Sequence, residues 1–156
     1  MKKETQKTIL HGTAVLLKSL AHEPSVVFLR GKSGSGKSDL AFRLCEAGGE
    51  LICDDQVAFE RRVDKIYADS VPAIRGLLEV RGVGLLHYPV ARSARLRLVV
   101  DLVMDGKDMP RLPEPESVDI LDVNIPRFRL HAFDVSASLK VFKAMEVVHK
   151  PALAVK

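Results

Sequence analysis

The stretch Gly31-Lys32-Ser33-Gly34-Ser35-Gly36-Lys37-Ser38 decides how this chain folds, because it matches the phosphate-loop pattern G-x-x-x-x-G-K-[ST]. The apolar run Val26-Val27-Phe28-Leu29 precedes it and predicts a strand, while Leu40 and Leu44, four residues apart, predict a helix after it. Strand, glycine-rich loop and helix in this order are the setting that the pattern requires. The alternative interpretation is a glycine-rich turn that only caps a helix.

The eight residues of the loop are the candidate nucleotide-binding residues. Glycines let the backbone wrap closely around a polyphosphate, so that successive N–H groups and the N-terminus of the helix face its charge. We expect Lys37 to reach the β- and γ-phosphates and the Ser38 hydroxyl to bind Mg²⁺. The helix should end at Gly48-Gly49, since glycine readily adopts the left-handed conformation that follows a helix.

A second chemical signal follows this helix. The segment Leu51-Ile52-Cys53-Asp54-Asp55 predicts a short apolar strand that ends in two carboxylates. A strand lying beside the loop strand would place a carboxylate near the metal and the γ-phosphate, where it can orient the metal or accept a proton from an incoming hydroxyl. The alternative is an ordinary turn, for which Asp-Asp is common.

Other charged residues have no role that their local sequence decides. His11 precedes Gly12 within a predicted strand and is of interest only if it points towards the phosphates. Glu79 and Arg81 lie in an apolar segment with several glycines, where they must face solvent or have a partner. Arg111 lies between Pro110 and Pro113, in a loop that the prolines stiffen, and it could equally be an ordinary exposed arginine.

Composition indicates one globular domain that spans residues 1–156. Hydrophobic residues make up 47% of the chain and charged residues 28%. The net charge of +4 is too small, and the basic residues too scattered, to indicate nucleic acid. Cys45 and Cys53 lack metal-ligand spacing and are interpreted as reduced core thiols. No apolar stretch is long enough to span a membrane, so we expect a cytoplasmic protein with no membrane partner.

The fold class expected is α/β, with a central mixed sheet around the phosphate loop. Residues 56–69 alternate between apolar and polar side chains and predict a hairpin, which argues against a purely parallel sheet. Residues 138–150 have helical spacing and predict an amphipathic helix that Pro151 ends.

Together these segments resemble the catalytic domain of HPr kinase/phosphorylase. The resemblance covers most of the chain. Its most specific part is Glu79-Val80-Arg81-Gly82-Val83-Gly84, in register after Asp54-Asp55. It implies an ATP-dependent kinase, with pyrophosphate as an alternative donor, that phosphorylates a serine of an HPr-type phosphocarrier and can reverse the reaction by phosphorolysis.

The resemblance also implies roles for particular residues. It implies catalytic roles for His11, Lys37, Asp54, Asp55 and Arg111, a Mg²⁺ site at Ser38 and Glu79, and a place for Arg81 in the segment linked to the kinase reaction. Which of Asp54 and Asp55 is the base stays open.

Two departures from the family pattern are visible in the sequence. Longer members carry an additional N-terminal domain, so this chain resembles the short, catalytic form. Members also tend to have a Gly-Arg-Asn element late in the chain, in a region linked to dephosphorylation, where this chain has Ala132-Phe133-Asp134-Val135-Ser136-Ala137-Ser138. The kinase reaction is therefore better supported than phosphorolysis. The resemblance also implies a homo-oligomer, a hexamer. The alternative functions are a non-catalytic ATP-sensing module and a small-molecule kinase.

Overall fold

The phosphate-loop pattern follows strand β3 (His22–Arg30) and precedes helix α1 (Lys37–Glu46) in the computed structural model, which describes residues 5–155. This confirms the order of strand, loop and helix expected from the sequence. Residues 26–29 of β3 are fully buried, as expected for a strand covered on both faces. α1 ends just before Gly48, whose φ of +100° is the left-handed conformation predicted for its C-terminal glycine.

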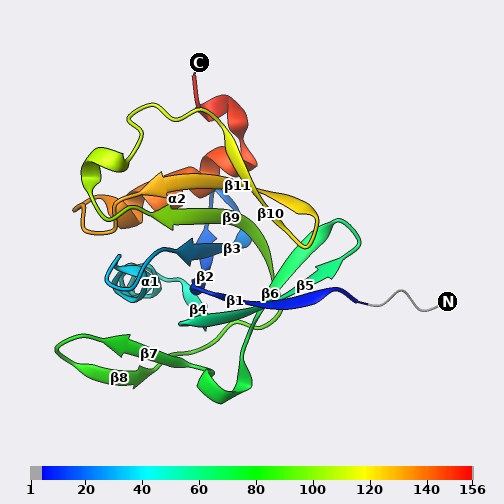
Figure 1. Cartoon of the computed structure of the whole chain (residues 1–156), viewed down its shortest axis with the longest axis vertical. Coiled ribbons are helices and arrows are strands. Elements are labelled where there is room, and N and C mark those ends of the chain that lie inside the picture. The colour runs from blue at the N-terminus through cyan, green and yellow to red at the C-terminus, as the bar shows by residue number, and fades with distance from the viewer. Residues whose placement is uncertain (1–4, 156) are drawn as a thin grey trace.

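The sheet around β3 is mixed, as predicted. β3 pairs in parallel with β9 (Ala94–Leu102) and antiparallel with β2 (Thr13–Ser19). On the far side of β9, its last residues pair in parallel with β11 (Val123–Leu130), which forms a hairpin with β10 (Glu116–Ile120). Figure 1 shows these strands beside one another in the upper part of the molecule.

The strand that carries the two aspartates is β4 (Glu50–Cys53). It pairs with β2, so β2 separates it from the phosphate-loop strand. The expectation that this strand lies directly beside β3 was therefore wrong. β4 still runs parallel to β3, because each of the two is antiparallel to β2, and its carboxyl end reaches the same edge of the sheet.

An antiparallel group of strands completes the main sheet. β5 (Gln56–Arg62) and β6 (Lys65–Ser70) form the predicted hairpin, and β1 (Lys7–His11) pairs with β5. The chain passes from β1 to β2 at Gly12, whose φ is +151°. A Cβ atom there would lie 2.4 Å from Cε1 of Phe28 and 2.6 Å from the carbonyl oxygen of Leu29, so only glycine fits this corner.

The strands β7 (Leu77–Val80) and β8 (Gly84–His87) form a separate hairpin that Figure 1 shows apart from the main sheet. Leu78 and Val80 of β7 are buried in the same apolar cluster as α1. Glu79 lies between them on the strand and is exposed, since neighbouring side chains of a strand point to opposite faces. The charged residue of this segment therefore faces away from α1.

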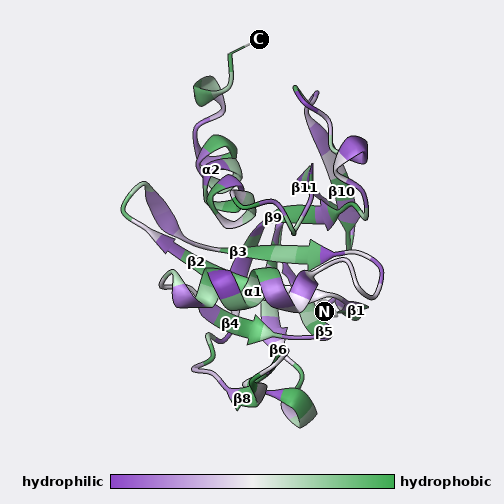
Figure 2. Cartoon of the chain, turned by 90° about the vertical axis from the view of Figure 1, so that its left-hand side faces the viewer, coloured by the Kyte–Doolittle hydropathy of each residue, from purple (hydrophilic) through white to green (hydrophobic). Residues whose placement is uncertain are grey.

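Both helices cover one face of the sheet. The α2 helix (Ala137–His149) matches the predicted C-terminal helix to within one residue at each end, and the short turn Pro151–Leu153 follows it. Val27 and Leu29 of β3 pack in one cluster with α1 and α2, while Val26 and Phe28 pack in a second cluster with the antiparallel strands. Figure 2 shows the later part of β3 as hydrophobic, with α1 drawn next to it on the side that faces the viewer.

The two cysteines are free thiols, as predicted. Cys53 is buried and Cys45 is half-buried. Burial, with a smaller contribution from Glu46, raises the pKa of Cys45 to about 12. Within residues 5–155, no helix is long and apolar enough to span a bilayer.

Candidate active site

The backbone of the phosphate loop has the conformation that anion binding requires. Gly31, Gly34 and Gly36 all have positive φ. Gly36 is the N-cap of α1 and has the left-handed conformation. It has no side chain, so no side-chain oxygen accepts a hydrogen bond from the first N–H groups of the helix. The N–H groups of the first turn of α1 are thus left for a ligand, where the helix dipole favours negative charge.

Lys37 lies across this loop. Its ammonium donates hydrogen bonds to the carbonyl oxygens of Gly31 at 2.6 Å and Lys32 at 3.1 Å. The side chain is half-buried. Ser35, also in the loop, is fully buried, and its hydroxyl has no hydrogen-bond partner within the described residues. A buried hydroxyl without a partner is costly unless a ligand completes it.

Asp54 joins the loop to the rest of the sheet. The Ser38 hydroxyl donates to its two carboxylate oxygens at 2.9 and 3.1 Å, and the fully buried Thr13 hydroxyl donates to Oδ1 at 2.7 Å. The backbone N–H of Asp55 also donates to Oδ1, at 3.0 Å. Three donors therefore fix this carboxylate against the start of α1.

Sequence reasoning missed Thr13. Its only signal was its place two residues after His11, directly before the apolar run 14–17, which did not single it out. The corner at Gly12 turns β2 so that Thr13 reaches Asp54, and the Gly12 N–H donates to the Asp55 carbonyl oxygen at 3.0 Å.

The second aspartate is in a different setting. Asp55 has a φ of +69°, and its carboxylate lies 3.4 Å from Nδ1 of His11. Both side chains are largely exposed, at 72% for Asp55 and 61% for His11. The structure thus brings together four of the five residues predicted as catalytic: His11, Lys37, Asp54 and Asp55.

The remaining predicted residues lie elsewhere. Glu79 is exposed on β7, Arg81 is exposed in the turn that follows, and Arg111 is exposed in the loop before β10. Within residues 5–155, Glu79 and Arg111 form no hydrogen bond or ion pair with the phosphate loop or with Asp54. Their predicted roles are not tested by these contacts and stay predictions.

The residues at the loop fit a magnesium ion. Mg²⁺ prefers oxygen ligands and is usually bound through one or two protein groups together with substrate phosphates and water. The Ser38 hydroxyl and the Asp54 carboxylate are oxygen donors in contact with each other at the start of α1. In the described part of the chain no group of three or more His, Cys, Asp or Glu side chains forms a preassembled metal cage.

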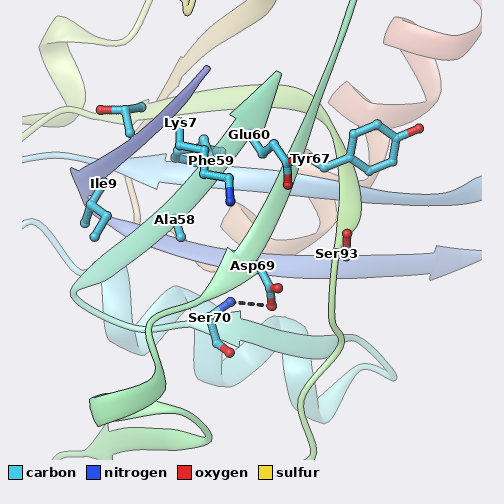
Figure 3. Close-up of a pocket in the computed structure, with 10 residues that line it drawn as sticks. Lys7, Ile9, Ala58, Phe59, Glu60, Tyr67, Asp69, Ser70 and Ser93 are labelled. Atoms are coloured by element: carbon cyan, nitrogen blue, oxygen red, sulfur yellow. Dashed lines mark hydrogen bonds between the residues drawn. The ribbon is translucent and has the colours of Figure 1, made fainter. Parts of the chain in front are cut away.

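One hollow on the surface lies away from this site. It has a volume of about 370 Å³ and lies on the strands β1, β5 and β6, where Lys7, Ile9, Phe59, Tyr67 and Asp69 are among its lining residues (Figure 3). None of the predicted site residues lines it. Because the converging polar groups are at the phosphate loop, we place the functional site there and not in the hollow.

A comparison with protein families identifies the chain. The family described as HPr Serine kinase C-terminal domain matches residues 2–150. The chain belongs to this family. This confirms the resemblance seen in the sequence, and the match extends over both helices and all the strands.

Two relatives of this chain are named HPr kinase/phosphorylase. The protein of Azoarcus sp. (strain BH72) is 36% identical over 137 residues, which cover 80% of this chain and 42% of the relative. The protein of Burkholderia lata is 36% identical over 132 residues, which cover 78% of this chain and 39% of the relative. The chain therefore spans about two fifths of the length of these relatives.

A solved structure shares the fold. The HPr(Ser) kinase/phosphatase from Coxiella burnetii superimposes with a TM-score of 0.76 at 19% sequence identity, over 94% of this chain and 98% of that one. The predicted α/β fold with a mixed central sheet, like the HPr kinase catalytic domain, is confirmed.

Proposed function

We propose that this chain is a single catalytic domain, residues 1–156, of an ATP-dependent protein-serine kinase that phosphorylates an HPr-type phosphocarrier of the phosphotransferase system. The observation that carries the proposal is the contact between Ser38 and Asp54 at 2.9 Å, beside Lys37 at the start of α1. It joins the hydroxyl of the phosphate loop to a carboxylate from another strand, which is the arrangement that phosphoryl transfer needs. Family membership supports the identity of the acceptor.

At the donor, residues 31–38 would hold the polyphosphate of ATP, or of pyrophosphate as an alternative donor, through backbone N–H groups. Lys37 would exchange its two carbonyl partners for β- and γ-phosphate oxygens. Ser38 and Asp54 would hold Mg²⁺, which when bound neutralises charge on the transferred group. Glu79 is the further metal ligand that the family resemblance implies.

At the acceptor, we assign the base to Asp55. Asp54 already accepts hydrogen bonds from Thr13, Ser38 and the Asp55 N–H, whereas the Asp55 carboxylate is exposed and has His11 beside it. As the serine oxygen bonds to the γ-phosphorus, the bond from that phosphorus to the β–γ bridging oxygen breaks and ADP leaves. The serine proton passes to Asp55. His11 would orient Asp55, and Arg111 would stabilise charge on the transferred phosphoryl group.

The proposal includes the location of the protein, its oligomeric state and the reverse reaction. We place the protein in the cytoplasm as a homo-oligomer, a hexamer by resemblance, with no nucleic-acid or membrane partner. Phosphorolysis of the phosphoserine product is a separate activity. The Ala132–Ser138 stretch lacks the Gly-Arg-Asn element linked to it, so we expect the forward reaction to dominate.

The test is to incubate the protein with Mg-ATP and a purified HPr-type carrier and to measure the intact mass of the carrier. We expect one added phosphate on a serine, strongly reduced in Lys37→Ala and in Asp55→Asn. Adding inorganic phosphate afterwards tests phosphorolysis through loss of that mass.

An unchanged carrier mass at high enzyme concentration, with ATP binding intact, would contradict the kinase proposal. It would favour the ATP-sensing module. Consumption of ATP with a nucleoside, sugar or carboxylate in place of the carrier would instead identify a small-molecule kinase. An Asp54→Asn variant that still binds ATP but has lost its Mg²⁺ dependence would support the division of roles between the two aspartates.

A further inference from the structure

The loop after β11 lies against the phosphate loop. Residues 131–136 join β11 to α2. A Cβ atom at Gly36 would lie 2.7 Å from Cβ of Ala132 and 3.2 Å from Cζ of Phe133, so the ring edge of Phe133 touches the backbone at the start of α1. Arg43 of α1 donates a hydrogen bond to the Ala132 carbonyl oxygen and thereby ties this loop to the helix. The stretch that departs from the family pattern is thus a neighbour of the proposed ATP site.

Phe133 is fixed in position although it is exposed. Its side chain is 58% exposed. The ring of His131 meets it edge-on, with centroids 5.7 Å apart and planes at 73°. His131 is itself held, since its Nδ1 lies 3.3 Å from the Val103 carbonyl oxygen. A large apolar ring that is held by its neighbours and is still largely open to solvent is suited to stack on a flat ligand.

Sheet topology places this ring on a defined side of the phosphates. β4, β9 and β11 all run parallel to β3, so their carboxyl ends meet at the edge that carries the phosphate loop. In the strand order, β4 lies on one side of β3, while β9 and β11 lie on the other. Asp54 at the end of β4 marks the side of the metal and the transferred phosphate. On the opposite side of β3 from Asp54, the phosphate loop is bordered by the end of β11 and the loop that carries Phe133.

We propose that Phe133 is the stacking platform for the purine base of the nucleotide whose phosphates occupy the loop at residues 31–38. This inference rests on the nucleotide site proposed above and adds the part of the ligand that the phosphate loop does not contact. Stacking on a phenyl ring uses the π-face that every base has, so we expect ATP and GTP to bind alike. CTP and UTP should bind less tightly, because their single ring offers less area.

Two variants and two ligands test the platform. In isothermal titration calorimetry with Mg²⁺, Phe133→Ala should weaken ATP binding about tenfold, the loss of one base–aromatic stack. Binding of inorganic tripolyphosphate, which has no base, should change by less than about twofold, since the phosphate contacts persist. Leu139→Ala is the matched control, because Leu139 is 70% exposed on the first turn of α2, close to Phe133 in sequence. It should change neither affinity.

The second variant reports on the contact itself. The chain contains no Trp, so Phe133→Trp introduces a single fluorophore that keeps an aromatic face. We expect its emission to be quenched by Mg-ATP and Mg-GTP and left unchanged by tripolyphosphate, with ATP affinity close to that of the wild type.

The outcomes separate this inference from the proposed function. If wild-type protein binds neither ATP nor tripolyphosphate, the proposed nucleotide site is wrong. The proposal that Phe133 stacks on the base is then wrong as well. If both bind, but Phe133→Ala weakens them equally or leaves ATP binding unchanged, only the platform is overturned. A higher KM for the carrier in that same variant would then assign the exposed ring to carrier docking.

Discussion

The two ends of strand β3 both gather ionisable side chains, yet their backbones differ. At the carboxyl end, glycines with positive φ and the open N-terminus of α1 surround Lys37 and Asp54. At the amino end, His22 stacks on His149 of α2, with ring centroids 4.8 Å apart and planes at 7°, and the Ser25 hydroxyl lies 3.0 Å from His149 Nε2. At the second end the side chains contact one another, whereas the first end presents backbone N–H groups at a helix terminus.

Buried polar atoms without a hydrogen-bond partner occur at both ends among the described residues. They are the hydroxyl of Ser35 at the phosphate loop, and Nε2 of His22 together with Nε of Arg95 at the opposite end. Unsatisfied atoms alone therefore do not mark a site. The conformation of the backbone, and the helix terminus that faces the cluster, distinguish an anion site from a packed polar contact.

The largest effect that this comparison predicts is at Lys37. Lys37→Ala removes the ammonium that lies across the loop, so we expect carrier phosphorylation to fall at least about 100-fold, as when one preorganised donor is lost. Affinity for Mg-ATP should fall with it. The control is Lys18→Ala, because Lys18 contacts Glu50 at the far end of β2 and should leave activity unchanged. Full activity of Lys37→Ala would remove the phosphate loop from the mechanism.

A smaller effect is expected at Thr13, which acts by positioning Asp54. Thr13→Val keeps the shape of the buried side chain but removes the 2.7 Å hydrogen bond to Asp54. Losing a bond to a charged group costs about 1–3 kcal/mol, so we expect lower stability in urea titrations and a kcat about tenfold lower.

Thr13→Ser separates positioning from simple packing. It keeps the hydroxyl and loses a methyl group, so it should restore kcat and the Mg²⁺ dependence of the wild type while remaining slightly less stable. A Thr13→Val variant with unchanged kcat, or a Thr13→Ser variant as slow as Thr13→Val, would show that the hydrogen bond does not position Asp54.

Local sequence predicted one part of this site well because the part is itself local. The strand, the glycine loop, Lys37 and Ser38 are contiguous, and Asp54 and Asp55 directly follow the next apolar strand. Thr13 and Phe133 were missed as site residues because their positions depend on pairing between distant segments. Thr13 reaches Asp54 only after β2 is inserted between β3 and β4, and Phe133 reaches Gly36 only after β11 joins β9.

The same limit explains the error in the sheet order. Alternation and turn residues specify which segments are strands, and they predicted the β5–β6 hairpin correctly. They do not specify which strand lies next to β3. Residues 14–17 of β2 form an unbroken apolar run, so β2 could have been an inner strand anywhere in the sheet.

The smallest predicted effect is at the amino end of β3 and concerns pH. Burial, with Arg97 and His22 nearby, lowers the pKa of His149 below its usual 6.5. The unfolded chain then binds a proton more readily than the folded chain, so this group makes the protein less stable as the pH falls below about 6.5. The charged and titratable groups that act on it also include Glu23 and Arg95.

His149→Gln removes this titration and can keep a hydrogen bond to Ser25. We therefore expect Tm to fall less between pH 7 and pH 5 in this variant than in the wild type, by a few degrees at most, because the ring is partly exposed and solvent screens its charge. His87→Gln, at an exposed histidine of β8, is the control and should follow the wild type. Kinase activity at pH 7 should be the same in all three proteins, because the amino end of β3 contributes nothing to the phosphate site. A His149→Gln variant that loses activity at pH 7 without losing stability would show that the two ends of β3 are coupled. It would contradict the statement that only the carboxyl end contributes to the phosphate site.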